Sequence, residues 1–187
     1  MAQLQPRSHQ NADAEDRPGV DDPDASPASV ARQIALTALS SAPRTRAELA
    51  TLLAKRDVPT EVATAVLDRF GEVGLVDDAA FASAWVDSRH VGRGLARRAL
   101  GDELRRKGVD RVITSTALEQ VSDADELAAA RGLVRRKLVG SRGLEPAKRD
   151  RRLLGMLARR GYPSAIAWAA IKAELADASE SPINLDD

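Results

Sequence analysis

Apolar residues recur three times along this chain with the same internal spacing, at offsets of 51 and then 53 residues. The three sets are Leu49, Leu53, Val62 and Leu67; Leu100, Leu104, Ile113 and Leu118; and Leu153, Leu157, Ile166 and Ile171. A fixed period of this length indicates tandem copies of one small supersecondary unit. A unit of about 50 residues buries too little surface to be stable alone, so we expect neighbouring copies to pack together.

Between the second and third members of each set lies a pair of basic residues followed by a turn. The three segments are KRDVP (55–59), RKGVD (106–110) and RRGYP (159–163). Cations suit the negative C-terminal end of a helix dipole, Gly or Asp favours a turn, and Pro or Asp begins a new helix. Each repeat therefore contains one helix that ends at the basic pair and another that begins at Pro or Asp.

Helical periodicity and capping residues predict nine helices, and no segment alternates as a strand would. Ser26 precedes Pro27 at a helix start, and Thr45 with Glu48 fits a capping box. The expected helices cover approximately residues 27–41, 45–56, 59–74, 77–90, 95–107, 110–121, 122–140, 146–160 and 163–175. We expect Gly92-Arg93-Gly94 to end the fourth of these helices.

The fold class that follows is all-α, with three tandem three-helix repeats that form an elongated, curved body. The expected repeats cover residues 27–75, 76–121 and 122–175. Residues 1–26 mix Pro, Asp, Ala and Asn without hydrophobic periodicity, so ordering them would cost conformational entropy with little burial in return. We expect this segment and residues 176–187 to be disordered acidic tails.

Charge is distributed unevenly, although the formal net charge is zero. Residues 1–28 carry two arginines against six acids, and the segment from Glu174 to the end carries five acids and no base. The remaining residues, 29–173, therefore have a net charge of +9, which balances −4 and −5. A basic body between two acidic ends points to a polyanionic or acidic partner.

Composition argues against several classes of enzyme and against membrane insertion or export. The chain has no cysteine and only two histidines, His9 and His90, so cysteine-ligated zinc and an ordinary nucleophile, histidine and acid triad lack their residues. No apolar run of about 18 residues occurs, and the N-terminus lacks the pattern of a signal peptide. We expect a soluble cytoplasmic protein, most simply a monomer, with no catalytic residue, cofactor or metal ion.

The segment GLVDDAAFASAWVDSR (74–89) contains two of the five aromatic residues. Adjacent side chains diverge on a helix, so Asp77 or Asp78 is better explained as a helix cap than as half of a paired-carboxylate site. Phe81 and Trp85 are four residues apart and can form one apolar stripe. They could stack nucleobases, but such platforms interleave aromatics with cations, and the nearest cation here lies one turn further on. Packing in the core of the middle repeat is the favoured interpretation.

Basic residues are concentrated in the second and third repeats. Residues 131 to 160 contain eleven basic residues and only two acidic ones, Glu145 and Asp150. Unpaired cations on one face repel one another unless a polyanion or an acidic protein surface meets them, so a functional surface is favoured over an ordinary solvated face. The candidate partner-binding residues are Arg89, Arg93, Arg97, Arg98, Arg105, Arg106, Lys107, Arg135, Arg136, Lys137, Arg151, Arg152, Arg159 and Arg160.

The middle of the sequence also resembles a known family. The run GLVDDAAFASAWVDSRHVGRGLARRALGDELRRKGV, with RTRAEL before it and LARRGYPSAI after it, is similar to the RecX family of bacterial RecA regulators. The matching pattern is Gly-hydrophobic-hydrophobic-Asp-Asp, then Phe-Ala and Trp-Val, an Arg, Gly-x-Gly, and Glu-Leu-x-x-Lys-Gly. The resemblance covers roughly residues 30 to 175 and leaves the two tails outside.

The resemblance implies three tandem three-helix repeats, in agreement with the repeat found from spacing. It also implies a non-enzymatic regulator that lodges in the groove of the RecA filament on single-stranded DNA and inhibits ATP hydrolysis, strand exchange and the co-protease role in the SOS response. It carries over no catalytic residue. Two alternatives stay open: a helical DNA-binding module that acts independently of RecA, and a helical-repeat scaffold.

Overall fold

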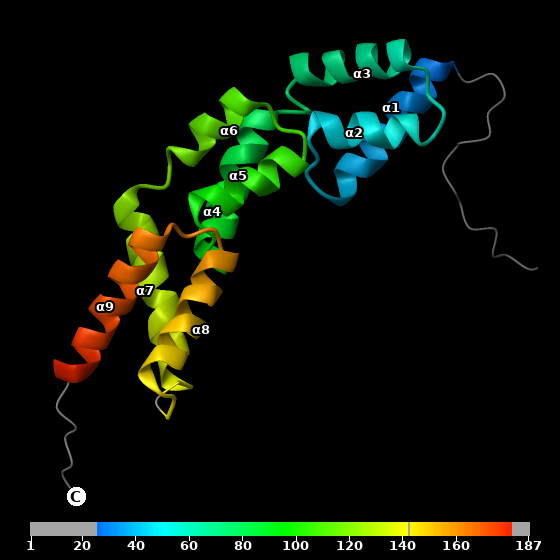
Figure 1. Ribbon diagram of the computed structural model, residues 1–187. Helices are drawn as coiled ribbons and strands as arrows, with labels where there is room; N and C mark the ends of the chain where they lie inside the picture. The colour runs from blue at the N-terminus through cyan, green and yellow to red at the C-terminus, as the bar shows by residue number, and fades with distance from the viewer. Residues whose placement is uncertain (1–25, 142, 181–187) are drawn as a thin grey trace, which may run out of the picture.

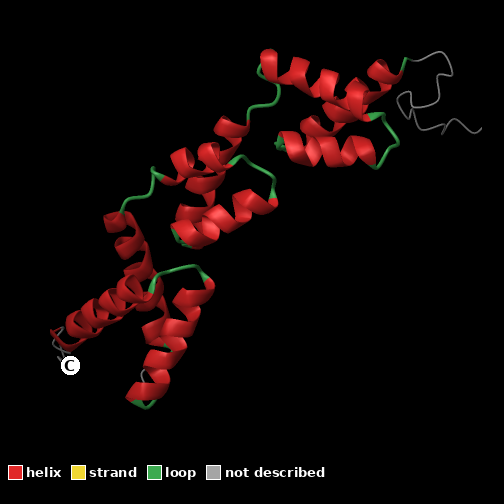
Figure 2. Cartoon of the chain, turned by 45° about the horizontal axis from the view of Figure 1, so that its top comes forward, coloured by secondary structure: helices red, strands yellow, loops and turns green. Residues whose placement is uncertain are grey.

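The computed structural model describes residues 26–141 and 143–180, and within them the chain forms nine α-helices and no strand. The helices follow one another along an elongated, bent body (Figure 1 and Figure 2). They are α1 (Pro27–Ser41), α2 (Arg46–Ala54), α3 (Thr60–Glu72), α4 (Asp78–Arg93), α5 (Arg97–Arg106), α6 (Arg111–Leu118), α7 (Asp123–Val139), α8 (Pro146–Arg159) and α9 (Ser164–Glu180). None of these helices has the length and apolar character needed to cross a membrane.

The helices group into three triples, α1 to α3, α4 to α6 and α7 to α9, because the extensive contacts between helices all fall within a triple. Each triple surrounds an apolar core. The first two leucines of every repeated set are fully buried, namely Leu49, Leu53, Leu100, Leu104, Leu153 and Leu157. The predicted all-α fold of three tandem three-helix repeats is confirmed.

The helices α2 and α4 begin at capping residues that the sequence predicts. Thr45 Oγ1 accepts a hydrogen bond from the Glu48 N–H at 3.1 Å, and the Glu48 carboxylate accepts one from the Thr45 N–H at 3.2 Å. These two bonds complete the predicted capping box of α2. Asp77, and not Asp78, caps α4, since its carboxylate accepts from two backbone N–H groups of the first turn at 2.9 Å.

The expected break after the fourth helix lies further along the chain than predicted. Helix α4 continues through Gly92 to Arg93 and ends at Gly94, whose φ of +60° is left-handed. Nothing lies within 4 Å of the position of a Cβ on Gly92, so this residue faces open space and the helix passes through it. The left-handed residue, and not the first glycine of the motif, therefore ends the helix.

Helix α9 ends five residues later than expected, at Glu180. Its end is held against α7, because Arg131 forms ion pairs with both Glu174 and Asp177 at 2.7 Å. The predicted acidic tail over 176–187 therefore begins inside a helix, which corrects its expected start. The other residues of the two predicted tails lie outside the described part of the chain, apart from Ser26, which caps α1.

The basic pairs end their helices with the same backbone geometry in all three repeats. The left-handed residues of the three turns are Asp57, Gly108 and Gly161, with φ of +58°, +74° and +86°. The N–H of the following residue (Val58, Val109 or Tyr162) donates to the carbonyl of the second leucine of the set, at 3.2, 3.1 and 3.2 Å. This bond is typical of a Schellman helix end, which turns the next apolar side chain back toward the helix.

The second helices of the repeats, α2, α5 and α8, dock head to tail along the body (Figure 1). Thr45 Oγ1 at the start of α2 donates to the carbonyl of Lys107 at the end of α5, at 2.6 Å. The N–H of Ala96 at the start of α5 donates to the carbonyl of Arg160 at the end of α8, at 2.9 Å. Helix ends of opposite partial charge therefore meet, and the dipoles of the three helices are favourably aligned.

A carboxylate from the later repeat completes each junction. Asp78 accepts from the Arg46 N–H at 2.9 Å, and Glu126 accepts from the Arg97 N–H at 2.7 Å. Arg46 and Arg97 are the first residues of α2 and α5, where backbone N–H groups have no acceptor within the helix. Each later repeat thus supplies part of the N-terminal cap of the helix before it.

Glycine in the turn allows the repeats to approach closely. A Cβ on Gly108 would lie 2.3 Å from the Cβ of Ala47, and a Cβ on Gly161 would lie 2.6 Å from the backbone nitrogen of Ala99. Among the described residues no repeat precedes the first one, and there the equivalent residue is Asp57, whose side chain is exposed. A side chain at this turn is therefore tolerated only where no other repeat docks.

We predict that Gly108→Ala destabilises the protein by about 2–4 kcal/mol, because the added methyl group must displace Ala47 while the residue keeps a left-handed φ. Gly74→Ala is the matched control. Its φ is +72°, but nothing lies within 4 Å of its Cβ position, so we expect a loss of only about 1 kcal/mol. Urea unfolding followed by circular dichroism measures both losses, and equal losses would contradict a packing role for Gly108.

Candidate basic interaction surface

Phe81 and Trp85 pack against the core of the second repeat, which confirms the favoured interpretation of this segment. Their rings stack with centroids 5.5 Å apart and planes 18° from parallel. The indole N–H of Trp85 donates to Glu103 Oε2 at 2.9 Å. The aromatic pair therefore joins α4 to α5.

Two of the predicted partner-binding cations lie over this aromatic pair. Arg89 Cζ is 4.2 Å and Lys107 Nζ is 4.4 Å from the centroid of the Trp85 ring. Lys107 also forms a 2.7 Å ion pair with Glu48 of α2, across the junction of the first two repeats. Burial opposes ionisation of Glu48, but hydrogen bonds from Lys107 and from the Thr45 N–H outweigh it and lower the pKa of this carboxylate. Arg89 and Lys107 thus have structural contacts of their own.

Arg97 and Arg105 are also paired within the protein. Arg97 binds Asp123 and Glu126 of α7, and Glu126 is buried at the second junction. The hydrogen bond to Asp123 is the main reason that the pKa of Arg97 is raised above its ordinary value. Arg105 pairs with Asp102, one turn earlier on the same helix, at 3.1 Å. This second pair is exposed and contributes little to stability.

Glu174 of α9 binds two arginines of α7 that have no nearby acid in the sequence. Its carboxylate is only 3% exposed and lies 2.7 Å from Arg131 Nε and 2.8 Å from Arg135 Nε. The hydrogen bonds from Arg135 lower the pKa of Glu174 most, burial opposes them, and the bond from Arg131 lowers it further. The acidic end of the chain therefore neutralises part of the basic body.

Sequence reasoning missed this role of Glu174 and Asp177, because both residues were assigned to the acidic C-terminal end of the chain. The spacing of α9 contains the signal that could have found them. Ile171, Glu174 and Asp177 follow one another at intervals of three residues, so they lie on one face of a helix. That face is the one turned toward α7.

Nine of the predicted cations have no carboxylate partner among the described residues. They are Arg93, Arg98, Arg106, Arg136, Lys137, Arg151, Arg152, Arg159 and Arg160. Arg160 instead donates from Nε to the carbonyl of Arg93 at 3.2 Å, at the junction of the second and third repeats. A scaffold whose basic face is paired internally does not fit these residues.

Five of the nine unpaired cations line one groove between α7 and α8, which we name the basic groove. Its volume is about 430 Å³, and its lining residues are Arg136, Lys137, Arg152, Arg159, Arg160, Leu133 and Met156. No acidic side chain is among them. Guanidinium groups bind phosphates and carboxylates through paired N–H donors, so the basic groove suits a polyanion or an acidic protein surface.

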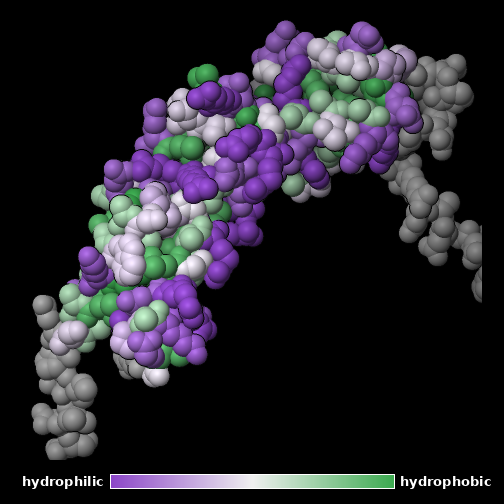
Figure 3. Space-filling view, viewed as in Figure 1, coloured by the Kyte–Doolittle hydropathy of each residue, from purple (hydrophilic) through white to green (hydrophobic). Residues whose placement is uncertain are grey.

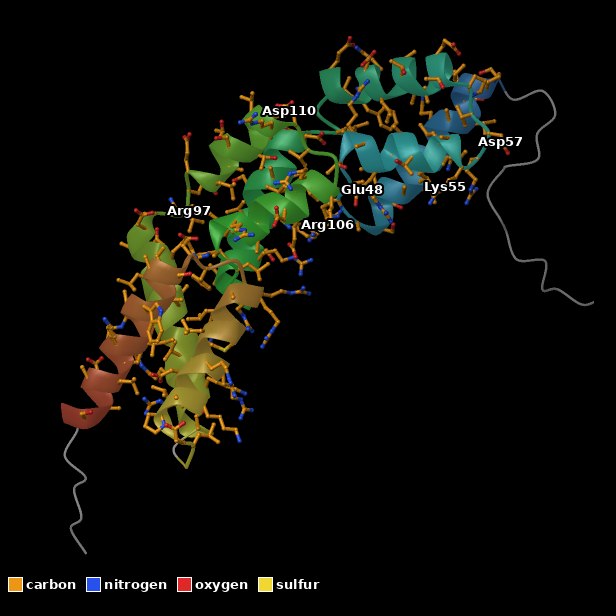
Figure 4. All side chains as sticks on the ribbon, in the orientation of Figure 1. Glu48, Lys55, Asp57, Arg97, Arg106 and Asp110 are labelled. Atoms are coloured by element: carbon orange, nitrogen blue, oxygen red, sulfur yellow. The ribbon has the colours of Figure 1, made fainter. Side chains whose placement is uncertain are left out.

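A second concentration of cations lies where the first two repeats meet. This junction groove has a volume of about 480 Å³, and its charged lining residues are Arg44, Glu48, Lys55, Arg105, Arg106 and Lys107. Figure 4 shows Lys55 and Arg106 on one side of the body and Asp110 on the other, and Figure 3 shows hydrophilic side chains gathered near this junction. Lys55, Arg106 and Arg159 are equivalent in the three repeats, so head-to-tail docking places one such cation in each repeat along the body.

Comparison with known families gives three consecutive matches. The RecX first three-helix domain matches residues 31–70, the RecX second three-helix domain matches residues 77–118, and the RecX third three-helix domain matches residues 124–171. These three family models together match more than half of the chain.

Individual proteins are similar over most of their length. The regulatory protein RecX of Thermobifida fusca is 58% identical over 145 residues, which is 78% of each chain. That of Streptomyces coelicolor is 49% identical over 166 residues, covering 89% of this chain and 88% of that protein. The crystal structure of RecX from Lactobacillus salivarius has the same fold, with a TM-score of 0.74 at 19% identity over 80% of this chain and 97% of that one.

We predict that Glu174→Gln lowers the free energy of unfolding by about 1–2 kcal/mol near neutral pH, because an amide cannot balance two guanidinium groups that solvent only partly screens. Since folding lowers the pKa of Glu174, its contribution is complete above the ordinary pKa of 4.5 and is lost as the pH falls below it. The difference between wild type and variant should therefore shrink in acid.

Urea unfolding of both proteins at a series of pH values measures this difference. Glu72→Gln is the matched control, because it removes an exposed pair with Arg69 at 2.9 Å and should cost less than about 0.5 kcal/mol. A Glu174→Gln effect that is as small as the control, or that does not change with pH, would contradict the prediction.

Proposed function

The chain belongs to the RecX family, and on this premise we propose that it is a cytoplasmic regulator that binds the RecA filament on single-stranded DNA. By binding, it inhibits the activities of RecA, namely ATP hydrolysis, strand exchange and co-protease function in the SOS response. It thereby regulates recombinational DNA repair. The protein acts as a monomer and catalyses no reaction of its own.

The basic groove is the observation that carries this proposal. Arg136, Arg152 and Arg159 are exposed there, and none of them has a carboxylate partner among the described residues. A nucleoprotein filament offers DNA phosphates and protein carboxylates, and both are bound by arginine through charge-assisted hydrogen bonds. The groove therefore supplies the attraction for the filament.

The elongated shape of the body suits a partner whose surface repeats at regular intervals. Lys55, Arg106 and Arg159 recur once in each repeat, and the head-to-tail docking of α2, α5 and α8 sets their separation. A filament presents the same subunit surface at regular intervals. An elongated protein with one cation per repeat can thus contact several subunits at once, which strengthens binding without any single strong contact.

We predict that Arg152→Glu combined with Arg159→Glu raises the concentration needed for half-inhibition of DNA-dependent ATP hydrolysis by RecA at least about tenfold. Each reversal removes a charge-assisted contact and adds repulsion within the basic groove. The matched control is Arg32→Glu combined with Arg111→Glu, which changes the net charge equally at two exposed positions outside that groove. The control should inhibit as the wild type does.

Circular dichroism confirms that each variant is helical before inhibition is measured. Unchanged inhibition by the folded groove variant would contradict the proposal. The alternative of direct DNA binding makes a different prediction: wild type would bind plain duplex DNA without RecA, with a steep dependence on salt, and the groove variant would lose that binding.

A further inference from the structure

Trp168 of α9 is the most exposed aromatic side chain among the described residues, at 41%. Its neighbours Ala167 and Ala170 are buried in the third core, so the indole projects away from that core. Trp85 is different, since its ring is covered by Arg89 and Lys107. Exposure of one apolar residue does not make a binding site, so the surroundings of Trp168 are decisive.

Trp168 and α8 together line an open depression of about 640 Å³ on the surface, which we name the Trp168 slot. The α8 residues are Ala147, Asp150, Arg151, Leu154, Gly155 and Ala158. Two of these residues are alanines and one is glycine, so α8 contributes little side-chain bulk to the slot. The depression therefore leaves room for a flat ring beside the exposed indole.

Gly155 is the residue of the slot that packing does not explain. Glycine inside a helix is destabilising relative to alanine. A Cβ on Gly155 would meet only Arg159 Nη1, at an ordinary contact distance of 3.5 Å, so the fold does not require a glycine here. Close approach of a ligand to the helix backbone does require a residue without a side chain.

Cations accompany the slot. Arg151 lines it, and Arg152 and Arg159 of the same helix line the basic groove. Asp150 is the one acid among the lining residues of the slot, and it is already paired with Arg149 at 3.0 Å. Helix α8 therefore lies between an apolar slot and a basic groove and presents unpaired cations to both.

We propose that the Trp168 slot binds an unpaired nucleobase, which stacks on the indole beside Gly155 while the adjoining phosphates contact Arg151 and the basic groove. Proteins that bind single strands combine these two elements, an aromatic face for the base and cations for the backbone. The cations beside the slot favour a polyanionic strand over an apolar side chain of a partner protein. This inference rests on the proposed function, in which single-stranded DNA is part of the partner.

The test uses the full chain and two fluorescently labelled oligomers of about a dozen residues, which is within the usual span of such sites. One is oligothymidylate, and the other has the same phosphate backbone without bases. Trp168→Leu should weaken binding of oligothymidylate about tenfold, as removal of one stacking ring typically does, and should leave binding of the abasic oligomer unchanged.

Two further variants sharpen the result. Trp168→Phe keeps an aromatic ring, so it should retain most of the affinity for oligothymidylate, while it removes the quenching of indole fluorescence that we expect from the wild type. Gly155→Ala should make α8 more stable and yet weaken binding of oligothymidylate, because its methyl group occupies the slot. Circular dichroism verifies that each variant is folded. If Trp168→Leu disrupts α9, the comparison of Trp168→Phe and Gly155→Ala with the wild type still tests the stacking site.

Equal weakening on both oligomers, or no weakening on either, would overturn the stacking site. So would a Trp168→Leu variant that binds oligothymidylate normally but no longer inhibits RecA, since Trp168 would then contact protein. The proposed function is judged separately. If reversal of Arg152 and Arg159 abolishes inhibition while Trp168→Leu changes nothing, the basic groove stands and the stacking site fails.

Discussion

The structure depends on the capping of one repeat by the repeat that follows it. A helix begins with backbone N–H groups that need acceptors. The N–H groups of Arg46 and Arg97 donate to Asp78 and Glu126 of the next repeat, and the N–H of Ala96 donates to the carbonyl of Arg160 at the end of α8. Both junctions pair a helix start with a carboxylate and a carbonyl of the next repeat, although the Thr45 hydroxyl is the donor to the carbonyl at the first junction and the Ala96 N–H at the second, so the three repeats extend in one direction. Each triple surrounds a core, and Ala96 of the second repeat is packed into the core of the third, so these polar contacts and apolar packing together join the repeats.

The same helix ends serve both folding and binding. In the second and third repeats, the second residue of the basic pair contacts the preceding repeat. Lys107 pairs with Glu48, and Arg160 donates to the carbonyl of Arg93. The first residue of the pair, Arg106 or Arg159, stays exposed and unpaired among the described residues. Two adjacent cations can differ in this way because neighbouring side chains on a helix point about 100° apart.

The third repeat separates its charges in the same manner. Arg135 turns toward Glu174 of α9, whereas the adjacent Arg136 lines the basic groove beside α8. The acids of α9 therefore remove cationic charge from one flank of α7 and leave the other flank basic. Helix α8 also presents cations to two sites: Arg152 and Arg159 line the basic groove, and Arg151 lines the Trp168 slot.

The sequence by itself determined the nine helices of the described residues, the capping box of α2, the turns after the basic pairs and the threefold repetition, because these depend on residues within a few positions of one another, as with Thr45 and Glu48. It left open whether Asp77 or Asp78 caps α4, and it placed the ends of α4 and α9 too early. It also indicated where cations are abundant. Only the tertiary structure decided which of them are free, since Arg135 meets Glu174 across 39 positions and Lys107 meets Glu48 across 59. Ion pairing and exposure depend on distance in space, so neither the basic groove nor the slot at Trp168 could be read from the spacing of residues along the chain.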